Sequence, residues 1–517
     1  MTSLHLRHPG IHPFSGCDVN TLLDARAEAR SDHPLLIWAP FGEDHRTWTY
    51  ADFAHDSKRL AAGLAARGVA AGERVLIHME NCPEILLAWY ACARIGAIAV
   101  TTNARAAGPE LAYFADHAEA VCVLTQPKFA DLAAEHCPGT KWTAVTGTAE
   151  FDALYGDAEA APSVPIDPMR EVGIQYTSGT TSRPKGVVWT HANALWGFRV
   201  NALHMGLTKD DVHLLHMPLF HTNAQAYSFG GSLHAGGSCV VMPRFSARNF
   251  WPTALKHGCT WASMNAFSAK ALMAHPVPED HKFRLWGSAV AEPPWDQHFG
   301  VRTIGWWGMT ETMTHGIVSD HHQRARSMMI GRAAPEYEVA VLDDAGAPAA
   351  FGAVGHLFIR GIPGLSLFKE YLSNPDATAA AYDDDGWFIT GDRVVLHEDG
   401  FIQFANRDKD MLRVGGENVA ASEIEAVAMQ LADVREVAVV AQKDEMRDEL
   451  PVIFVLPEGG LDAAAPDLAE RVLEACRAAL ADFKVPRAVH LVDDFPRSTL
   501  DKIAKAELRK RLEDGAS

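Results

Sequence analysis

From residue 47 onward the sequence alternates between helical and extended hydrophobic periods, and this alternation limits the folds open to the chain. Residues 50–68 place Phe53, Leu60 and Leu64 on one helical face and end at Gly68, as an amphipathic helix does. A short apolar strand at 74–79, a helix at 83–96 and a strand at 97–102 follow. The repeat predicts an α/β fold with mostly parallel sheets.

The pattern changes toward the C-terminus. A strand-like run with charges and paired glycines at 400–416 leads into alternating short helices and strands, ending in a helix predicted over 501–513. At 517 residues the chain is too long for one ordinary core. We predict a large N-terminal domain of layered sheets and helices over 1–406, and a small α+β domain over 407–517.

Composition excludes several classes of protein. A hydrophobic content of 48% with 21% charged residues is typical of a folded globular enzyme. The formal net charge of −19 repels phosphate backbones and acidic lipid, so we expect neither nucleic-acid nor membrane-surface binding.

Cysteine usage and the N-terminus predict a cytoplasmic protein. The eight cysteines are scattered without a CxxC pair, which indicates free thiols in a reducing compartment. The first residues have no apolar core of signal-peptide length, and the most apolar stretch, 84–100, is interrupted by Arg94. The sequence leaves open whether the chain is a monomer or a homodimer.

The run YTSGTTSRPKG at 176–186 follows an apolar strand and combines hydroxyls and glycines with a lysine. Backbone N–H groups and hydroxyls in such a loop can converge on an anion, and Lys185 adds a positive charge. A Walker A loop requires a hydroxyl residue after its lysine, whereas Pro184 and Gly186 flank this one. The run therefore predicts a polyphosphate-binding loop of another kind.

This run resembles the phosphate loop of the AMP-forming acyl-CoA synthetases, which belong to the adenylate-forming superfamily. Further motifs occur in the order of that family: PLFH (218–221), GWWGMTE (305–311), GWFITGD (386–392), FANRDKDMLRVGGENV (404–419), FKVP (483–486) and PRSTLDKIAK (496–505). Together they cover nearly the whole chain. Segments 361–378 and 413–425 look most like the carnitine and crotonobetaine CoA-ligase group.

The resemblance implies an ATP site and a magnesium ion. Glu311 would bind Mg²⁺ together with Thr177, Trp307 would stack on adenine, and Asp392 and Arg407 would bind the ribose. Magnesium prefers oxygen ligands, and an indole can stack as tyrosine does. The ATP-binding residues implied in full are Thr177, Ser178, Gly179, Thr180, Thr181, Lys185, Ser288, Ala289, Trp307, Gly308, Met309, Thr310, Asp392, Arg407 and Lys502.

The resemblance also implies two half-reactions. Lys502 would neutralise charge while a carboxylate displaces pyrophosphate from the α-phosphate, and Lys185 and Glu311 would assist. Rotation about a hinge at 407–410, with Lys409 at its centre, would then admit coenzyme A along Gly415 and Gly416. His221 would line the acyl site and gate access of the thiol.

Three positions depart from the family pattern. Ser182 and Asp501 each replace a glycine, and His356 replaces a glutamate. Asp501 places an acid next to Lys502. Trp306 stands beside the expected acyl tunnel, where many relatives have a small residue, so we expect a small or compact carboxylic acid as substrate.

Two other functions remain open on the sequence. The chain could load the thiol of a carrier protein, although it ends at Ser517 without a carrier domain. It could alternatively bind nucleotide without turnover, a reading that only Asp501 favours.

Overall fold

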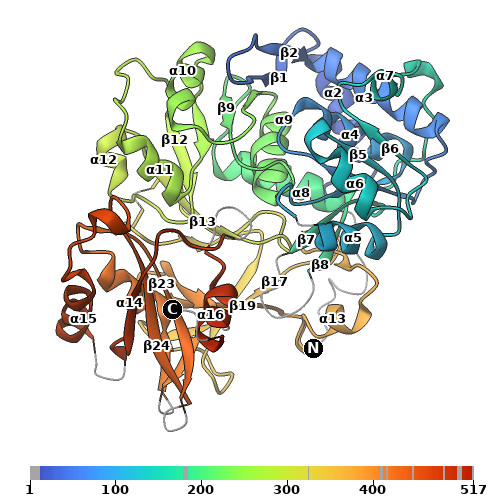
Figure 1. Cartoon of the computed structure of the whole chain (residues 1–517). Coiled ribbons are helices and arrows are strands. Elements are labelled where there is room, and N and C mark those ends of the chain that lie inside the picture. The colour runs from blue at the N-terminus through green and yellow to red at the C-terminus, as the bar shows by residue number, and fades with distance from the viewer. Residues whose placement is uncertain are drawn as a thin grey trace. The chain divides into compact units, whose positions relative to one another are not determined.

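The computed structural model describes residues 12–106, 108–177, 184–323, 325–407, 411–414, 417–444, 448–480, 484–497 and 503–514 (Figure 1). The described chain forms two compact units. The first contains the residues up to Thr177, Pro184–Val339 and Ile359–Ile389, and the second contains Ala340–Phe358 and the residues from Thr390 onward. The domain boundary at 406/407 and the hinge stay predictions.

A nine-stranded sheet organises one part of the first unit, in the order β15-β14-β13-β12-β11-β9-β10-β1-β2. Its central strands are parallel, and antiparallel strands stand at both edges. The bounds are β1 (Pro34–Trp38), β2 (Arg46–Thr49), β9 (Val212–Leu215), β10 (Ser238–Val241), β11 (Trp261–Ser263), β12 (Leu285–Ser288), β13 (Thr303–Gly308), β14 (His315–Val318) and β15 (Arg332–Ala333). Helices α10 (Ala247–His257), α11 (Ala266–Met273) and α12 (Trp295–Phe299) contribute to the core on one face.

A seven-stranded sheet organises the rest of this unit, in the order β18-β8-β7-β4-β3-β5-β6. The bounds are β3 (Arg74–His78), β4 (Ile98–Thr101), β5 (Ala120–Thr125), β6 (Trp142–Val145), β7 (Glu171–Thr177), β8 (Lys185–Thr190) and β18 (Glu370–Tyr371). Strands β7, β4, β3, β5 and β6 are parallel. Helices α5 (Gly108–His117) and α6 (Ala130–His136) pack on this sheet through Leu111, Phe114 and Ala133.

Helices buried on almost every side pack beside the two sheets. Twelve of the thirteen residues of α4 (Pro83–Ile95) and ten of the fourteen residues of α8 (His191–His204) are buried, and α8 contacts both β8 and β14. Because β8 and β14 belong to different sheets, these contacts place α8 between the two sheets. The remaining helical segments of this unit are α2 (Val19–Ala29), α3 (Tyr50–Ala66), η1 (Pro127–Phe129), α7 (Ala149–Asp152), η2 (Ala158–Ala160), η3 (Asn223–Gly230, a π-helix), α9 (Gly231–Ala235) and α13 (Pro375–Ala379).

The second unit contains a sheet with β22-β21-β24-β23 in order and β25 beside β24. Because side chains alternate along a strand, Val439 and Ile453 pack toward α14 and α15, whereas Val440 and Phe454 pack toward α16. The bounds are β21 (Met411–Val414), β22 (Glu417–Ala420), α14 (Ala421–Ala428), β23 (Val434–Asp444), β24 (Asp448–Pro457), η5 (Leu461–Ala463), α15 (Leu468–Ala479), β25 (Ala488–Leu491) and α16 (Lys505–Glu513).

A further four-stranded sheet has the order β16-β17-β19-β20. Its strands are β16 (Glu338–Leu342), β17 (Val354–Arg360), β19 (Phe388–Leu396) and β20 (Ile402–Arg407). The chain passes from one compact unit to the other within β16, β17 and β19.

The structure confirms the predicted α/β class and corrects one helix. The helix predicted to start at 501 begins at Lys505, because Ile503 forms a bridge with Arg497 and packs against the core of the second unit instead. All eight cysteines are free thiols, and seven of them are buried. Within the described ranges, no helix is long and apolar enough to cross a bilayer.

Because His78 and His216 are buried, we predict that the free energy of unfolding falls in mild acid. Burial lowers the pKa of His78 and of His216 to about 4, from an ordinary value of 6.5. Between these values the unfolded chain binds more protons than the folded one, so lowering the pH destabilises the protein, by about 2 kcal/mol per ring at pH 5. We expect the unfolding temperature to fall between pH 7 and pH 5, measured by scanning fluorimetry.

The control for this prediction is His216→Phe. His216 packs against Phe245 and Phe250, so a phenylalanine suits its surroundings and does not titrate. We expect a shallower pH dependence in this variant, and an unfolding temperature constant from pH 7 to pH 5 in the unaltered protein would refute the prediction.

Candidate active site

The two ends of the predicted phosphate loop lie opposite each other in the hairpin of β7 and β8. Thr177 pairs with Lys185 across the ladder, and the Thr177 hydroxyl donates to the Lys185 carbonyl oxygen at 3.4 Å. Strand β7 is parallel to β4 and antiparallel to β8. The loop between β7 and β8 therefore starts at the carboxyl end of a parallel strand, where α/β sheets bind ligands. The structure therefore fixes both ends of a loop whose residues 178–183 lie outside the described part.

Glu311 and Lys185 lie close to the same tyrosine. Tyr371 donates from its hydroxyl to Oε1 of Glu311 at 2.9 Å, and the Lys185 ammonium lies 4.4 Å from the centroid of the Tyr371 ring. Burial, followed by the negative charge of Glu311, raises the pKa of Tyr371, so its phenol stays a neutral donor. Sequence reasoning did not single out Tyr371, which lies sixty residues from Glu311 and meets it only through the fold.

The backbone around Glu311 is held on several sides. The Glu311 carbonyl accepts from the Phe368 amide at 2.7 Å, and the Trp189 indole donates to the Thr310 carbonyl at 3.0 Å. Tyr337 donates to the carbonyl of Thr312 at 2.8 Å. Glu311 itself is only 4% exposed, which is unlike a surface glutamate.

The donor set around Glu311 fits magnesium bound mainly through substrate phosphates. Within the described ranges, no group of three His, Cys, Asp or Glu side chains could hold a metal by itself. Magnesium commonly takes one or two carboxylates and completes its shell with phosphate oxygens and water. A single buried carboxylate near the phosphate-loop lysine meets that requirement, with Thr177 at the base of the loop.

The candidate adenine-binding residues lie at the ends of two neighbouring parallel strands. Ser288 ends β12 and pairs with Gly305 of β13, and Trp307 follows two residues later on β13. Ser288 is buried and Ala289, just beyond the strand, is exposed. Gly308, Met309 and Thr310 continue from Trp307 to Glu311. The fold thus places these candidates in one region, and their contact with adenine stays a prediction.

Trp306 occupies the space over β12 on the sheet face opposite to Trp307, because adjacent strand residues alternate. A Cβ atom at Gly287 would lie 1.8 Å from the Trp306 ring, so only glycine leaves room there. The indole stacks on His315 at a centroid distance of 4.7 Å and an interplanar angle of 10°, and it meets the Tyr227 ring edge-on at 5.7 Å. These rings fill the space that a small residue at 306 would leave open.

His221 stands in a turn fixed by a buried polar network. Its carbonyl accepts from the Gln225 amide at 3.0 Å, and the Gln225 side chain accepts from Gln175 at 2.7 Å. The Thr222 hydroxyl donates to Gln175 at 2.7 Å. π-Helical turns such as the following η3 frequently occur at functional sites. The half-buried His221 is thereby tied to β7, the strand that carries the phosphate loop.

The two candidate ribose-binding residues belong to the second compact unit. Asp392 on β19 lies directly opposite Arg407 on β20 in an antiparallel ladder. Asp392 is 4% exposed, and its backbone amide donates to the Thr390 hydroxyl at 3.1 Å. The ladder brings these residues together at backbone level, which is what a shared ribose would require.

Several predicted site residues lie outside the described residues. These are Ser178, Gly179, Thr180, Thr181, Lys409, Gly415, Gly416 and Lys502, together with the departures Ser182 and Asp501. The third departure, His356, contacts Asp344 at 2.9 Å, and hydrogen bonds from His356 and Arg393 lower the pKa of the Asp344 carboxyl. His356 therefore belongs to a local ion-pair cluster of the second unit.

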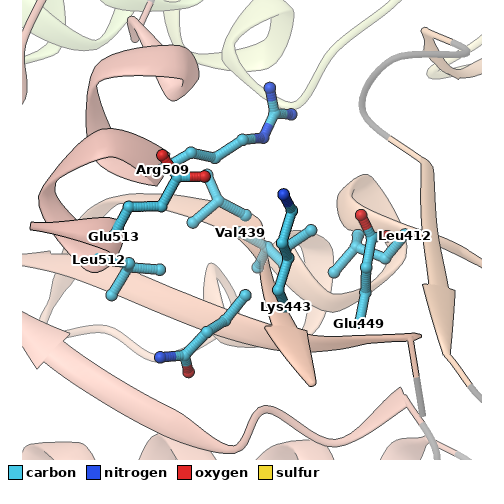
Figure 2. Close-up of a pocket in the computed structure, with 10 residues that line it drawn as sticks. Leu412, Val439, Lys443, Glu449, Arg509, Leu512 and Glu513 are labelled. Atoms are coloured by element: carbon cyan, nitrogen blue, oxygen red, sulfur yellow. The ribbon is translucent and has the colours of Figure 1, made fainter. Parts of the chain in front are cut away.

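A separate pocket of about 370 Å³ lies within the second unit (Figure 2). Its lining combines apolar Leu412, Val439 and Leu512 with charged residues. The charged residues are Lys443, Glu449, Arg509 and Glu513. None of the predicted site residues lines it.

The described site combines the base of a phosphate loop, the buried carboxylate of Glu311, and a cluster of rings around Trp306. These are the parts of an adenylate-forming enzyme. Comparison with known proteins bears this out: residues 23–372 match the AMP-binding enzyme family, and residues 423–502 match the AMP-binding enzyme C-terminal domain. The chain belongs to the AMP-binding enzyme family and is an AMP-forming acyl-CoA ligase.

Curated relatives agree over almost the full length. The crotonobetaine/carnitine–CoA ligase of Salmonella paratyphi A is 33% identical over 96% of this chain and 99% of its own length. The Salmonella typhi protein of the same name matches equally well, at 33% identity over the same shares. The predicted resemblance to this ligase group is thereby confirmed.

Solved structures show the same fold. ATP-bound MatB from Rhodopseudomonas palustris superposes with a TM-score of 0.86 at 27% identity, covering 96% of this chain and 100% of its own. The Bacillus subtilis o-succinylbenzoate coenzyme A synthetase, solved with ATP and a magnesium ion, gives a TM-score of 0.83 at 25% identity. The match covers 95% of this chain and 99% of the synthetase chain.

Proposed function

We propose that this ligase activates a small or compact carboxylic acid with ATP and Mg²⁺ as acyl-AMP and transfers the acyl group to coenzyme A. The observation that carries the acid class is Trp306, whose indole lies over Gly287 and against His315. The space between β12 and η3 is thereby filled with rings, which leaves little length for an alkyl chain. The relatives named for crotonobetaine and carnitine ligation support the same size range.

In the first half-reaction a carboxylate oxygen attacks the α-phosphorus of ATP, and pyrophosphate leaves with the bonding electrons. Lys185 and the loop hydroxyls bind the β- and γ-phosphates, and Lys502 neutralises charge between the carboxylate and the α-phosphate. Glu311 and Thr177 would hold a magnesium ion, which would supply charge neutralisation at the phosphates. Tyr371 orients the Glu311 carboxylate through its hydrogen bond.

In the second half-reaction the sulfur of coenzyme A attacks the acyl carbon, AMP leaves, and the thiol proton passes to solvent. His221, held by the Gln175–Gln225 network, lines the approach of the thiol. A rotation of the C-terminal domain about Lys409 would move Lys502 away and bring Gly415 and Gly416 to the pantetheine arm; these four residues lie outside the described ranges. Asp392 and Arg407 retain the ribose through both steps.

The location is proposed as cytoplasmic. All eight thiols are free and seven are buried, which suits a reducing compartment.

The experiment that tests the function is pyrophosphate release with ATP and Mg²⁺ over a panel of acids, each with and without coenzyme A. The panel runs from acetate to palmitate and adds carnitine, crotonobetaine, benzoate and a steroid acid. We expect sustained turnover with one class of compact acids, and only when coenzyme A is present. Preference for palmitate would contradict the proposed acid class, and no release with any acid despite ATP binding would contradict the reaction.

A further inference from the structure

His315 is the side chain against which the Trp306 ring rests. It is fully buried, and its ring lies nearly parallel to the indole, at 10° and 4.7 Å between centroids. The Tyr227 ring meets His315 edge-on at 4.5 Å. The position of the indole therefore depends on the plane of the His315 ring.

A second histidine and a glutamate hold that plane. Nδ1 of His204 lies 3.4 Å from Nδ1 of His315, and Nε2 of His204 lies 3.0 Å from Oε2 of Glu336. When Glu336 accepts from the Nε2–H of neutral His204, Nδ1 of His204 is an acceptor and His315 donates to it. Burial is the largest single effect on Glu336 and opposes its ionisation, but the hydrogen bond from His204, nearby positive charge and a backbone hydrogen bond together lower the pKa of Glu336, so the carboxylate is charged.

A histidine at position 315 lowers the free energy of unfolding relative to an apolar side chain of similar size. Nε2 of His315 is buried and has no hydrogen-bond partner among the described residues. An unsatisfied buried polar atom is costly, and an apolar side chain would fill the same place without that cost. The arrangement thus points to a role in setting the ring plane.

We propose that His315, held by His204 and Glu336, is a positioning residue that fixes the Trp306 indole and so sets the depth of the acyl pocket. This inference rests on the proposed function, because it concerns which acids the ligase accepts. His315 does not need to touch the substrate, and its effect passes through Trp306. The two residues should therefore act on acid selectivity as one unit.

The test measures kcat/KM for straight-chain acids from four to eight carbons and takes the eight-to-four-carbon ratio. For His315→Leu, which fills the volume without a ring, we expect this ratio to rise about tenfold, because 1.4 kcal/mol of lost discrimination corresponds to that factor. The KM for the eight-carbon acid should fall relative to that for the four-carbon acid, while the KM values for ATP and coenzyme A stay unchanged. His315→Phe restores a stacking ring and should return the ratio most of the way to that of the unaltered protein.

A double-mutant cycle shows whether the effect passes through Trp306. In a Trp306→Gly background, His315→Leu should leave the ratio where Trp306→Gly alone places it. The matched control is His213→Ala, because His213 is also fully buried but packs on Trp261. This control should lower the unfolding temperature and leave the ratio unchanged.

The outcomes separate this inference from the proposed function. If the unaltered protein shows no acid-dependent pyrophosphate release, the proposed function fails. If the unaltered protein is active but folded His315→Leu keeps the original eight-to-four-carbon ratio, the positioning role fails. It also fails if the effects of His315→Leu and Trp306→Gly on this ratio simply add. Should His315→Leu not fold, a ratio for His315→Phe far from that of the unaltered protein would overturn the role of ring stacking.

Discussion

Glu311→Gln is expected to lower acid-dependent pyrophosphate release by about 10²- to 10³-fold at saturating ATP, because it removes a negative charge and one carboxylate oxygen where we propose that magnesium binds. The substitution keeps side-chain volume, and the amide oxygen can still accept from Tyr371, which lies 2.9 Å from Oε1. The fold should therefore survive. The measurement is initial rate against Mg²⁺ concentration, and the variant should need more Mg²⁺ for half-maximal activity.

The matched control is Glu171→Gln. Glu171 begins β7, the strand that leads to the phosphate loop, and its carboxylate contacts Lys369 at 2.5 Å. Removing that partly exposed charge should change the rate less than twofold, as is usual for surface ion pairs. If Glu311→Gln is as active as Glu171→Gln, Glu311 is not a magnesium ligand.

Trp306→Gly is expected to shift acid preference toward longer chains. Loss of the indole opens the space above Gly287, and each buried methylene contributes about 0.8 kcal/mol. Four additional methylenes then amount to about 3 kcal/mol, so the eight-to-four-carbon ratio of kcat/KM should rise by about 100-fold. The variant should also lose about 3–5 kcal/mol of stability from the cavity, so assays belong well below its unfolding temperature.

Trp286→Gly is the control for the loss of a buried indole. Trp286 lies on β12 next to Gly287 but on the opposite face, where it packs with Phe250 and Phe299. This variant should be destabilised similarly without a change in chain-length ratio. An unchanged ratio in folded Trp306→Gly would show that the indole does not limit the acyl pocket.

How far the sequence predicts this site depends on whether its parts are adjacent along the chain. The loop between Thr177 and Lys185 and the motif that contains Glu311 could be singled out from the sequence because each is a continuous run of residues; the hairpin that joins β7 to β8 was not predicted. Their α/β setting was predicted because the hydrophobic period alternates along the chain. Both belong to local structure that short-range patterns encode.

Contacts between distant segments were not predicted. Tyr371 bonds Glu311 across sixty residues, and Gly287 makes room for Trp306 from a neighbouring strand. No spacing rule connects His315 to His204 and Glu336, since their approach depends on the packing of α8 against β14. The start of α16 was misplaced for the same reason, because a core contact and a bridge hold Ile503 outside the helix.

The central claim is that catalysis passes through an acyl-adenylate, and a reaction without coenzyme A tests it most directly. The enzyme is incubated with ATP, Mg²⁺ and the preferred acid, quenched, and analysed by mass spectrometry before and after addition of coenzyme A. We predict that acyl-AMP and pyrophosphate accumulate first and that coenzyme A then converts the adenylate to acyl-CoA and AMP. Formation of ADP and phosphate, with no adenylate at any time, would contradict the account.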